Sequence, residues 1–220
     1  MPQLTTLCRV AMLALVLSLV GCASTHPVAY AGIDSAPHLT PNRDDPNGRV
    51  PFRYNGNVEW QHYTALLVDP VAIYHGQDAQ FQDISEDEKN ELAAYMQSTF
   101  TDRLATRFKL VQTPQAHALR LKLTLTGAEK STQGVSTILH FDIAGGMYNV
   151  VQAIRGGQPA ATGSASYAVE IYDATSNQLL SAYVTKRYPR AMNVAASFGA
   201  LHAARSGIER GADSLSNELK

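Results

Sequence analysis

The sequence predicts an α+β fold: a two-layer sandwich in which a mixed, mostly antiparallel sheet carries helices on one face. Apolar and polar residues alternate over 119–126 and again over 164–188, which indicates strands with one buried face. Apolar residues recur every four positions over 92–104, and a second apolar seam runs from about Val194 to the end, which indicates two amphipathic helices. Strands and helices in this arrangement are typical of two-layer domains.

The first 21 residues are predicted to be a lipoprotein signal peptide. Arg9 precedes an apolar stretch over 10–20, which at 1.5 Å per residue is too short to cross a hydrocarbon core of about 30 Å. Leu19-Val20-Gly21-Cys22 forms a lipobox, so we expect cleavage before Cys22 and attachment of fatty acyl chains, such as palmitate, to that residue. Ala23, where an aspartate would favour the inner membrane, favours the outer membrane. We therefore expect a lipid-anchored protein of the cell outer membrane with its domain in the periplasm.

Residues 22–57 are predicted to be the lipidated cysteine and a proline-rich tether, followed by a single α+β domain over 58–220. Two alternatives stand for this tether: a disordered spacer, or a segment that folds back onto the domain through its apolar side chains. The tether contains five prolines (Pro27, Pro37, Pro41, Pro46, Pro51) and the apolar residues Tyr30, Ile33, Leu39, Phe52 and Tyr54.

Within the domain, the apolar stretch 63–74 predicts a buried strand with a kink at Asp69-Pro70. Ser85 and Glu88 form a capping box that starts a helix ending near Arg107. A short strand over 108–111 and a hairpin over 164–188 complete the predicted sheet. Small residues on the last helix predict close backbone contact, more readily inside the monomer than at a dimer face. They are Gly199, Ala203, Gly207 and Gly211.

Charge and cysteine content exclude several classes of function. Lys and Arg total 18 against 19 Asp and Glu, so the chain lacks the basic surface that nucleic acid binding requires. Cys8 leaves with the signal and Cys22 takes the lipid, so the mature domain has neither a disulfide nor a thiol nucleophile.

No motif for catalysis, cofactors or metal binding is present, so we expect a protein that is not an enzyme, with no cofactor and no metal. The histidines stand singly, which predicts surface or strand-end positions. Four acidic residues could converge near the first strand, although acids before a helix are usually caps; they are Asp69, Asp78, Asp83 and Asp87.

The segment 141–157 is the least ordinary part of the chain. It is apolar, is bounded by glycine pairs, and carries only Asp142 and Arg155 as charged residues. It is either an exposed flap that meets a partner, a lipid or the membrane, or a short helix packed over the end of the sheet. The candidate partner surface comprises Phe141, Ile143, Met147, Tyr148, Val151 and Ile154.

Together with the lipobox, four segments carry a resemblance to a family of bacterial envelope lipoproteins whose domain is of unknown function. They are Tyr30-Ala-Gly-Ile33, Trp60-Gln-His-Tyr63, Val68-Asp-Pro-Val-Ala-Ile-Tyr74 and Tyr188-Pro-Arg-Ala191. The order of elements is also similar to small domains of the curli-secretion lipoprotein, of activators of penicillin-binding proteins and of the Tol translocation protein. The resemblance implies an adaptor or assembly module with an envelope protein as partner, with no nucleic acid. The alternative is a carrier of a lipid or small apolar ligand, for which an apolar cavity between sheet and helices would be required.

Overall fold

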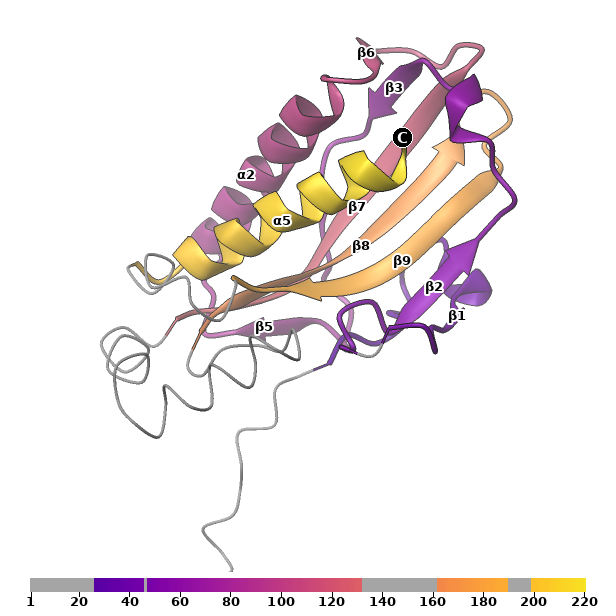
Figure 1. Cartoon of the computed structure of the whole chain (residues 1–220). Helices are drawn as coiled ribbons and strands as arrows, with labels where there is room; N and C mark the ends of the chain where they lie inside the picture. The colour runs from indigo at the N-terminus through magenta and orange to yellow at the C-terminus, as the bar shows by residue number, and fades with distance from the viewer. Residues whose placement is uncertain (1–25, 46, 132–161, 190–198) are drawn as a thin grey trace, which may run out of the picture.

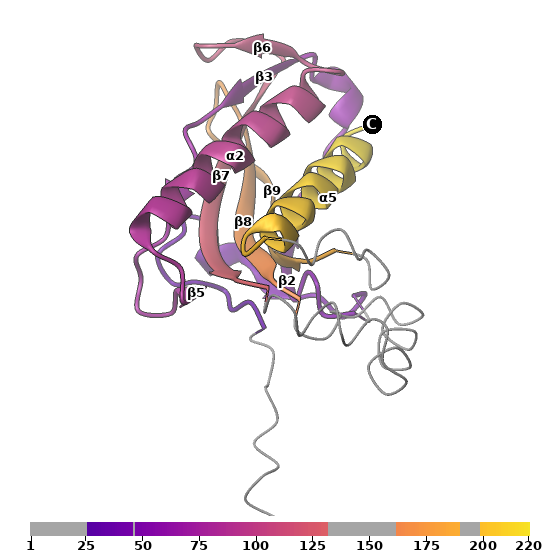
Figure 2. The same cartoon turned by 90° about the vertical axis from the view of Figure 1, so that its left-hand side faces the viewer.

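The computed structural model describes residues 26–45, 47–131, 162–189 and 199–220, and within them one mixed sheet packs against two helices (Figures 1 and 2). The sheet has nine strands in the order β1-β2-β9-β8-β7-β3-β6, with β4 and β5 also paired to β7. The predicted α+β class is confirmed. The strands are β1 (Thr40–Pro41), β2 (Phe52–Asn55), β3 (Ala65–Val68), β4 (Ala72–Ile73), β5 (Gln80–Gln82), β6 (Lys109–Val111), β7 (Ala118–Glu129), β8 (Ser164–Asp173) and β9 (Leu179–Arg187).

The sheet is antiparallel on one side of β7 and parallel on the other. Strands β7, β8, β9, β2 and β1 pair antiparallel, and the β8–β9 hairpin is the one predicted from residues 164–188. On the other side, β3, β4 and β5 follow one another along β7, each parallel to it, because Asp69-Pro70 interrupts the pairing between β3 and β4. Strand β7 is the longest strand of the described sheet and pairs with four others, β3, β4, β5 and β8.

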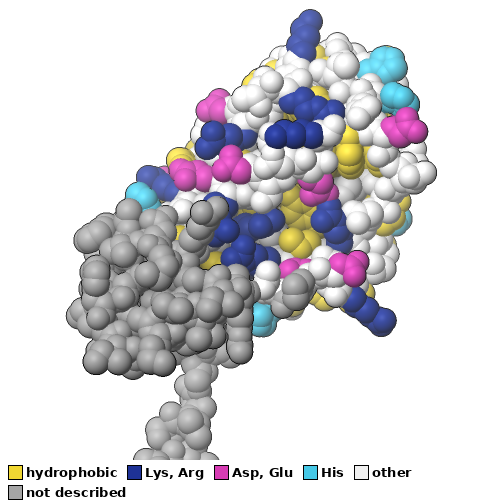
Figure 3. Space-filling view, in the orientation of Figure 1, with side chains coloured by type: hydrophobic (Ala, Val, Ile, Leu, Met, Phe, Trp, Pro, Cys, Tyr) yellow, Lys and Arg dark blue, Asp and Glu magenta, His cyan; other side chains and the backbone are white. Residues whose placement is uncertain are grey.

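Both long helices lie on the same face of the sheet and run in the same direction (Figure 2). Helix α2 (Glu86–Leu104) starts at the predicted capping box, in which the Ser85 hydroxyl accepts from the Glu88 amide and the Glu88 carboxylate accepts from the Ser85 amide. Helix α5 (His202–Glu218) follows the last strand, and short 3-10 turns occur at η1 (Ala36–His38) and η2 (Trp60–His62). Acidic and basic side chains are interspersed over this helix face (Figure 3).

The hydrophobic core fills the space between the helices and the sheet. Leu92, Met96, Phe100 and Leu104 of α2 are all fully buried, as the four-residue periodicity predicts. They pack in one cluster with the alternate residues of β7 and β8 that point to the same face, namely Leu119, Leu121, Leu123, Leu125, Tyr167, Val169 and Ile171.

Two glycines of α5 allow the helix to touch the sheet directly. A Cβ at Gly207 would lie 2.4 Å from the carbonyl oxygen of Arg187, and one at Gly211 would lie 1.5 Å from the hydroxyl of Tyr167. Gly207 and Gly211 of the predicted row therefore serve contact inside the monomer, whereas Gly199 lies before the start of α5 and is not part of the helix.

The opposite face of the sheet is partly covered by residues 26–39, which we call the N-terminal strap. Tyr30, Ile33 and Tyr74 form a second apolar cluster with Ala168 and Val184, which point away from the helices. Because both of its faces are covered, β8 is buried at nine of its ten positions. Two alternatives were open for the proline-rich segment, a disordered spacer or a segment folded back onto the domain. In the structure, residues 26–45 and 47–57 are folded back onto the domain. The domain boundary expected at residue 58 is therefore corrected, since β2 already belongs to the sheet.

The signal peptide, Cys22 and the segment 141–157 lie outside the described residues, as does the predicted helix start at Val194. Within the part that the structure describes, α5 begins at His202. No helix in that part is long and apolar enough to cross a membrane.

Candidate functional site

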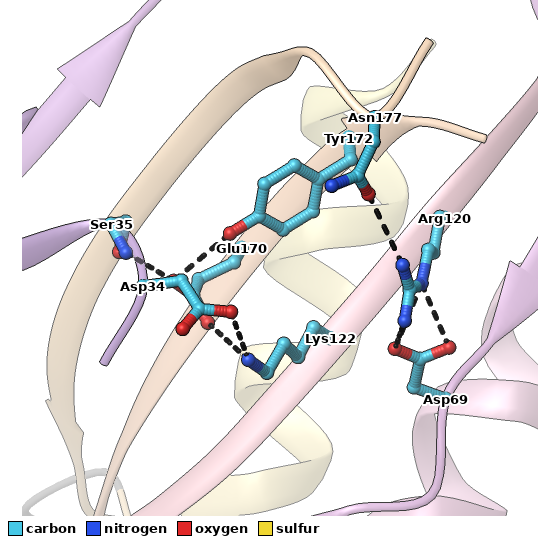
Figure 4. A network of polar contacts seen from close by, with 8 residues as sticks. All are labelled: Asp34, Ser35, Asp69, Arg120, Lys122, Glu170, Tyr172 and Asn177. Carbon is cyan, nitrogen blue, oxygen red and sulfur yellow. Dashed lines mark hydrogen bonds and ion pairs between the residues drawn. The ribbon is translucent and has the colours of Figure 1, made fainter. Parts of the chain in front are cut away.

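The most concentrated group of polar side chains lies on the sheet face that the helices leave open, where β7 and β8 are neighbours (Figure 4). The register of these strands places Lys122 directly opposite Glu170, and Arg120 directly opposite Tyr172. Directly opposite residues of antiparallel strands point to the same face, so the four side chains form one patch. Asp34 and Ser35 of the N-terminal strap meet this patch from above.

Glu170 is a buried carboxylate at the centre of this patch, with none of its surface exposed. Its Oε1 accepts a hydrogen bond from the Ser35 amide at 2.6 Å and one from the Tyr172 hydroxyl at 3.3 Å. Its Oε2 lies 3.9 Å from Nζ of Lys122. A buried charge needs such partners, because losing water costs several kcal/mol per ion. Glu170 thus joins the strap to the sheet through the charge-assisted bond from Ser35, and its ion pair with Lys122 links β8 to β7.

Lys122 links the strap to the sheet a second time. Its ammonium lies 2.5 Å from Oδ2 of Asp34, whose side chain is 68% exposed. Tyr172 completes the group. Burial, and to a smaller extent the charge of Glu170, raise the pKa of the Tyr172 hydroxyl. The hydroxyl therefore stays protonated and donates a hydrogen bond to the Glu170 carboxylate. The strap is therefore held to the sheet by two polar contacts, one from Ser35 to Glu170 and one from Asp34 to Lys122.

Arg120 forms the other half of the patch. Its guanidinium contacts both carboxylate oxygens of Asp69, with NH2 at 2.8 Å, and donates to the side-chain oxygen of Asn177 at 3.1 Å. The hydrogen bonds to Asp69 raise the pKa of Arg120 further. Asn177 adopts a left-handed conformation, with φ of 57°, in the β8–β9 turn, which suits asparagine. The kink at Asp69-Pro70 and the hairpin turn therefore position the arginine from both sides.

Between these two halves the surface is hollowed, with a volume of about 330 Å³. Its walls carry cations, an anion and hydrogen-bonding groups, with one apolar side chain. Such a lining can orient a polar or charged group by ion pairs and hydrogen bonds. The lining residues are Asp34, His38, Arg120, Lys122, Tyr172, Asn177 and Leu179.

The acidic residues weighed as a convergent site are separated by the structure. Asp69 lies level with Leu121 of β7, and Asp78 lies just before β5, which pairs at Gly127. Leu121 and Gly127 are six residues apart along β7, so Asp69 and Asp78 lie about 20 Å from each other in the direction of the strand. Asp78 serves the fold instead, since it accepts from Tyr74 and from the Ala31 amide. Among the described residues there is no group of three or more histidine, cysteine or acidic side chains placed to hold a metal ion.

Six of the seven histidines are described, and all six are exposed, as their isolated positions predict. His38 is the one that lines the hollow. Cys22 and the six residues of the candidate partner surface between Phe141 and Ile154 lie outside the described residues, so both stay predictions.

The residues of the hollow were not predicted as a site from the sequence. Arg120 and Lys122 were assigned to a solvated strand face, and Asp34 and His38 to a tether. One signal was present: Glu170 is a lone acid between the apolar residues Val169 and Ile171 of a strand. A single carboxylate in such a strand requires a cationic or amide partner, and β7 offers two cations at alternate positions.

The fold and this patch define an α+β domain with a polar site on its open sheet face. A family model described as a protein of unknown function, DUF3313, matches residues 29–215, and the chain belongs to this family. The expected membership of a family of unknown function is confirmed, whereas its lipoprotein nature stays a prediction. The chain matches no curated protein.

Solved structures resemble the chain distantly. The PelC dodecamer from Paraburkholderia phytofirmans shares 11% identity at a TM-score of 0.37, covering 72% of this chain and 92% of that one. Protein XCC0632 from Xanthomonas campestris shares 9% identity at a TM-score of 0.32, covering 75% and 86% respectively. At these scores the likenesses carry no argument about function.

Proposed function

We propose that the protein is a lipid-anchored, non-enzymatic adaptor of the outer membrane whose domain faces the periplasm and binds a polar part of another envelope component. The lipobox at Leu19–Cys22 supports the anchor, and Ala23 supports the outer membrane as its destination. The hollow on the open sheet face supports the binding role.

The character of the hollow is the observation that favours an adaptor over a carrier of apolar ligands. An apolar ligand needs a cavity lined by apolar side chains. The space between sheet and helices is instead filled, since Leu92, Met96 and Phe100 are fully buried against the sheet. The hollow lies on the other face and is lined by charges of both signs. It therefore suits a polar or charged segment of a protein partner.

The segment 141–157 is proposed as a second contact surface. The described residues on either side of it, Ser131 and Thr162, adjoin the paired ends of β7 and β8. We propose that the six apolar residues from Phe141 to Ile154 would bind the partner through apolar contacts.

The anchor is tested by replacing Cys22 with serine. We expect the wild-type chain to incorporate labelled palmitate and to sediment with outer membranes, and the C22S chain to lose the label and appear in the soluble periplasm. Membrane retention of an unlabelled C22S chain would contradict the proposed anchor.

The binding role is tested by a photo-crosslinking residue at His38, on the wall of the hollow, with His62 as the matched control. Both histidines are exposed, and His62 lies on η2, outside the lining of the hollow. We expect a discrete envelope protein crosslinked from position 38 but not from 62. A chain lacking 141–157 reports separately on the second surface. Equal crosslinking from both positions would refute the hollow as the binding site.

A further inference from the structure

The described chain is held to the domain from its first residue onward. The His26 carbonyl oxygen accepts a hydrogen bond from Nε2 of Gln80 at 2.8 Å, and Oε1 of the same side chain accepts from the Tyr30 hydroxyl at 3.0 Å. Gln80 belongs to β5, which pairs with β7. One side chain of the sheet therefore holds the strap at two points four residues apart.

The next residues of the strap are held just as closely. Asp78 accepts from the Ala31 amide at 3.2 Å, and the Tyr74 hydroxyl accepts from the Gly32 amide at 3.1 Å while donating to Asp78 at 2.6 Å. Tyr30 is 1% exposed and packs edge-on against Tyr74, with ring centroids 5.5 Å apart. Burial raises the pKa of Tyr30 to about 12. The strap is therefore part of the folded domain and cannot act as a spacer.

This docking fixes how far the domain can lie from a lipid on Cys22. Only four residue steps separate Cys22 from His26, and fully extended chain covers at most about 3.6 Å per residue, so the span is at most about 14 Å. A free coil over 22–57 would have a root-mean-square length of about 30–35 Å. We propose that the anchored domain rests against the membrane surface with its β5 end toward the lipid, an inference that rests on the proposed lipidation of Cys22.

The position of the strap also fixes which surfaces face the periplasm. Strand β5 pairs with the last residues of β7, whereas β3 pairs with its first residues and carries β6 on its other side, so these ends of the sheet lie opposite each other (Figure 1). Twelve residues of β7 at about 3.3 Å each separate them by about 36 Å. Arg120 is the third residue of this strand and lies near the far end. The hollow thus lies clear of the bilayer, open to a periplasmic partner.

Charge attraction to lipid is not needed for this orientation. At the β5 end, Lys130 lies 2.8 Å from Glu88, and Lys186 lies 2.7 Å from Glu129. Basic groups that are paired in this way offer little net attraction to anionic lipids. The orientation should therefore be insensitive to salt, since a short covalent connection is not screened.

Energy transfer to labelled lipid tests the proposal in the full mature protein reconstituted into vesicles of phosphatidylethanolamine and phosphatidylglycerol. Cys22 is consumed by lipid and the mature chain has no other cysteine, so one donor dye is placed through Gln77→Cys or Gln115→Cys. Both glutamines are exposed; Gln77 precedes β5, and Gln115 precedes β7 at the far end. We expect several-fold more efficient transfer from position 77 than from position 115, unchanged by salt.

A flexible insert of about 20 Gly and Ser residues between Thr25 and His26 is the matched control. Its root-mean-square length is about 25 Å, so the difference between the two dye positions should largely disappear. Mass spectrometry of the same samples reports the lipid on Cys22. Equal transfer from both positions in a chain shown to carry lipid overturns the apposition and leaves the anchor standing, whereas a chain without lipid overturns both.

Discussion

Replacing Gly211 with alanine tests the contact between α5 and the sheet. The added Cβ would lie 1.5 Å from the hydroxyl oxygen and 2.8 Å from Cζ of Tyr167, and 3.6 Å from Phe100. Tyr167 is fully buried and packs edge-on against Phe100, with centroids 5.8 Å apart, so its ring has little room to turn. The helix must move away from the sheet or the ring must leave its place.

The expected cost follows from two opposing effects. Alanine is favoured over glycine in a helix interior by about 1 kcal/mol. Overpacking in a well-filled core costs about 1–3 kcal/mol and more where backbone must shift. Because the contact of 1.5 Å lies far inside any tolerated distance, the second effect dominates. We therefore expect a cost near the upper end of that range, so that G211A lowers the free energy of unfolding by about 2 kcal/mol net.

Urea unfolding of the non-lipidated C22S chain, followed by circular dichroism, measures this change. Tyr167→Phe removes the oxygen nearest the added methyl group, so the G211A/Y167F pair should recover part of the loss, with a coupling energy of about 1 kcal/mol or more. Ser206→Ala, on the same helix and half-buried, is the control for helix propensity and should be neutral or slightly stabilising. A G211A chain as stable as its parent would refute the close approach of α5 to Tyr167.

Four further variants test the cap and the docking of the strap. Ser85→Ala removes the helix cap and should cost about 1 kcal/mol of unfolding free energy; an unchanged urea midpoint would contradict the capping box. Lys122→Met leaves Glu170 buried with only its two hydrogen bonds and should lower the free energy of unfolding by roughly 2 kcal/mol in the same assay. This is less than the loss expected for a fully buried ion pair, because the Lys122 side chain is 30% exposed. Adding Glu170→Gln to the K122M variant should recover much of that loss. If it does not, the charge interaction between Lys122 and Glu170 is contradicted. The hydrogen bond from the Tyr74 hydroxyl lowers the pKa of Asp78 in the folded protein. The ionised Asp78 carboxylate therefore stabilises the fold at pH values above the unfolded-state pKa near 4, and this stabilisation is lost as the pH falls through the lower folded-state pKa. D78N should therefore flatten the loss of stability as the pH falls below about 5, and an unchanged acid dependence would refute this role.

The spacing of apolar residues predicted correctly those helices and strands in which the local sequence pattern matches the burial of the side chains. The four-residue repeat of α2 and the alternation in β7 each describe one buried face, so the helix, the strand and the core between them followed directly. The box at Ser85 and Glu88 is local in the sequence and was correctly predicted for the same reason.

The N-terminal strap and the hollow were harder to predict because they depend on contacts between distant residues. The prolines and polar residues of the strap match a spacer in composition, and only its docking on Gln80, Asp78 and Glu170 shows otherwise. Arg120 and Lys122 sit at polar positions of an alternating strand, where a solvated face is the usual outcome. Their partners come from residues 34, 69 and 170, which no local pattern connects.

The pairing of the chain's early and late segments sets the order in which the domain can assemble. The Ser35 amide must wait for a carboxylate 135 residues later, and β2 must wait for β9, after which the described part of the chain contains only one more element, α5. Closing such long loops is entropically slow, and folds dominated by distant pairings form slowly. During synthesis the strap therefore remains unpaired after it has been made, until the strands that hold it have followed it out of the ribosome.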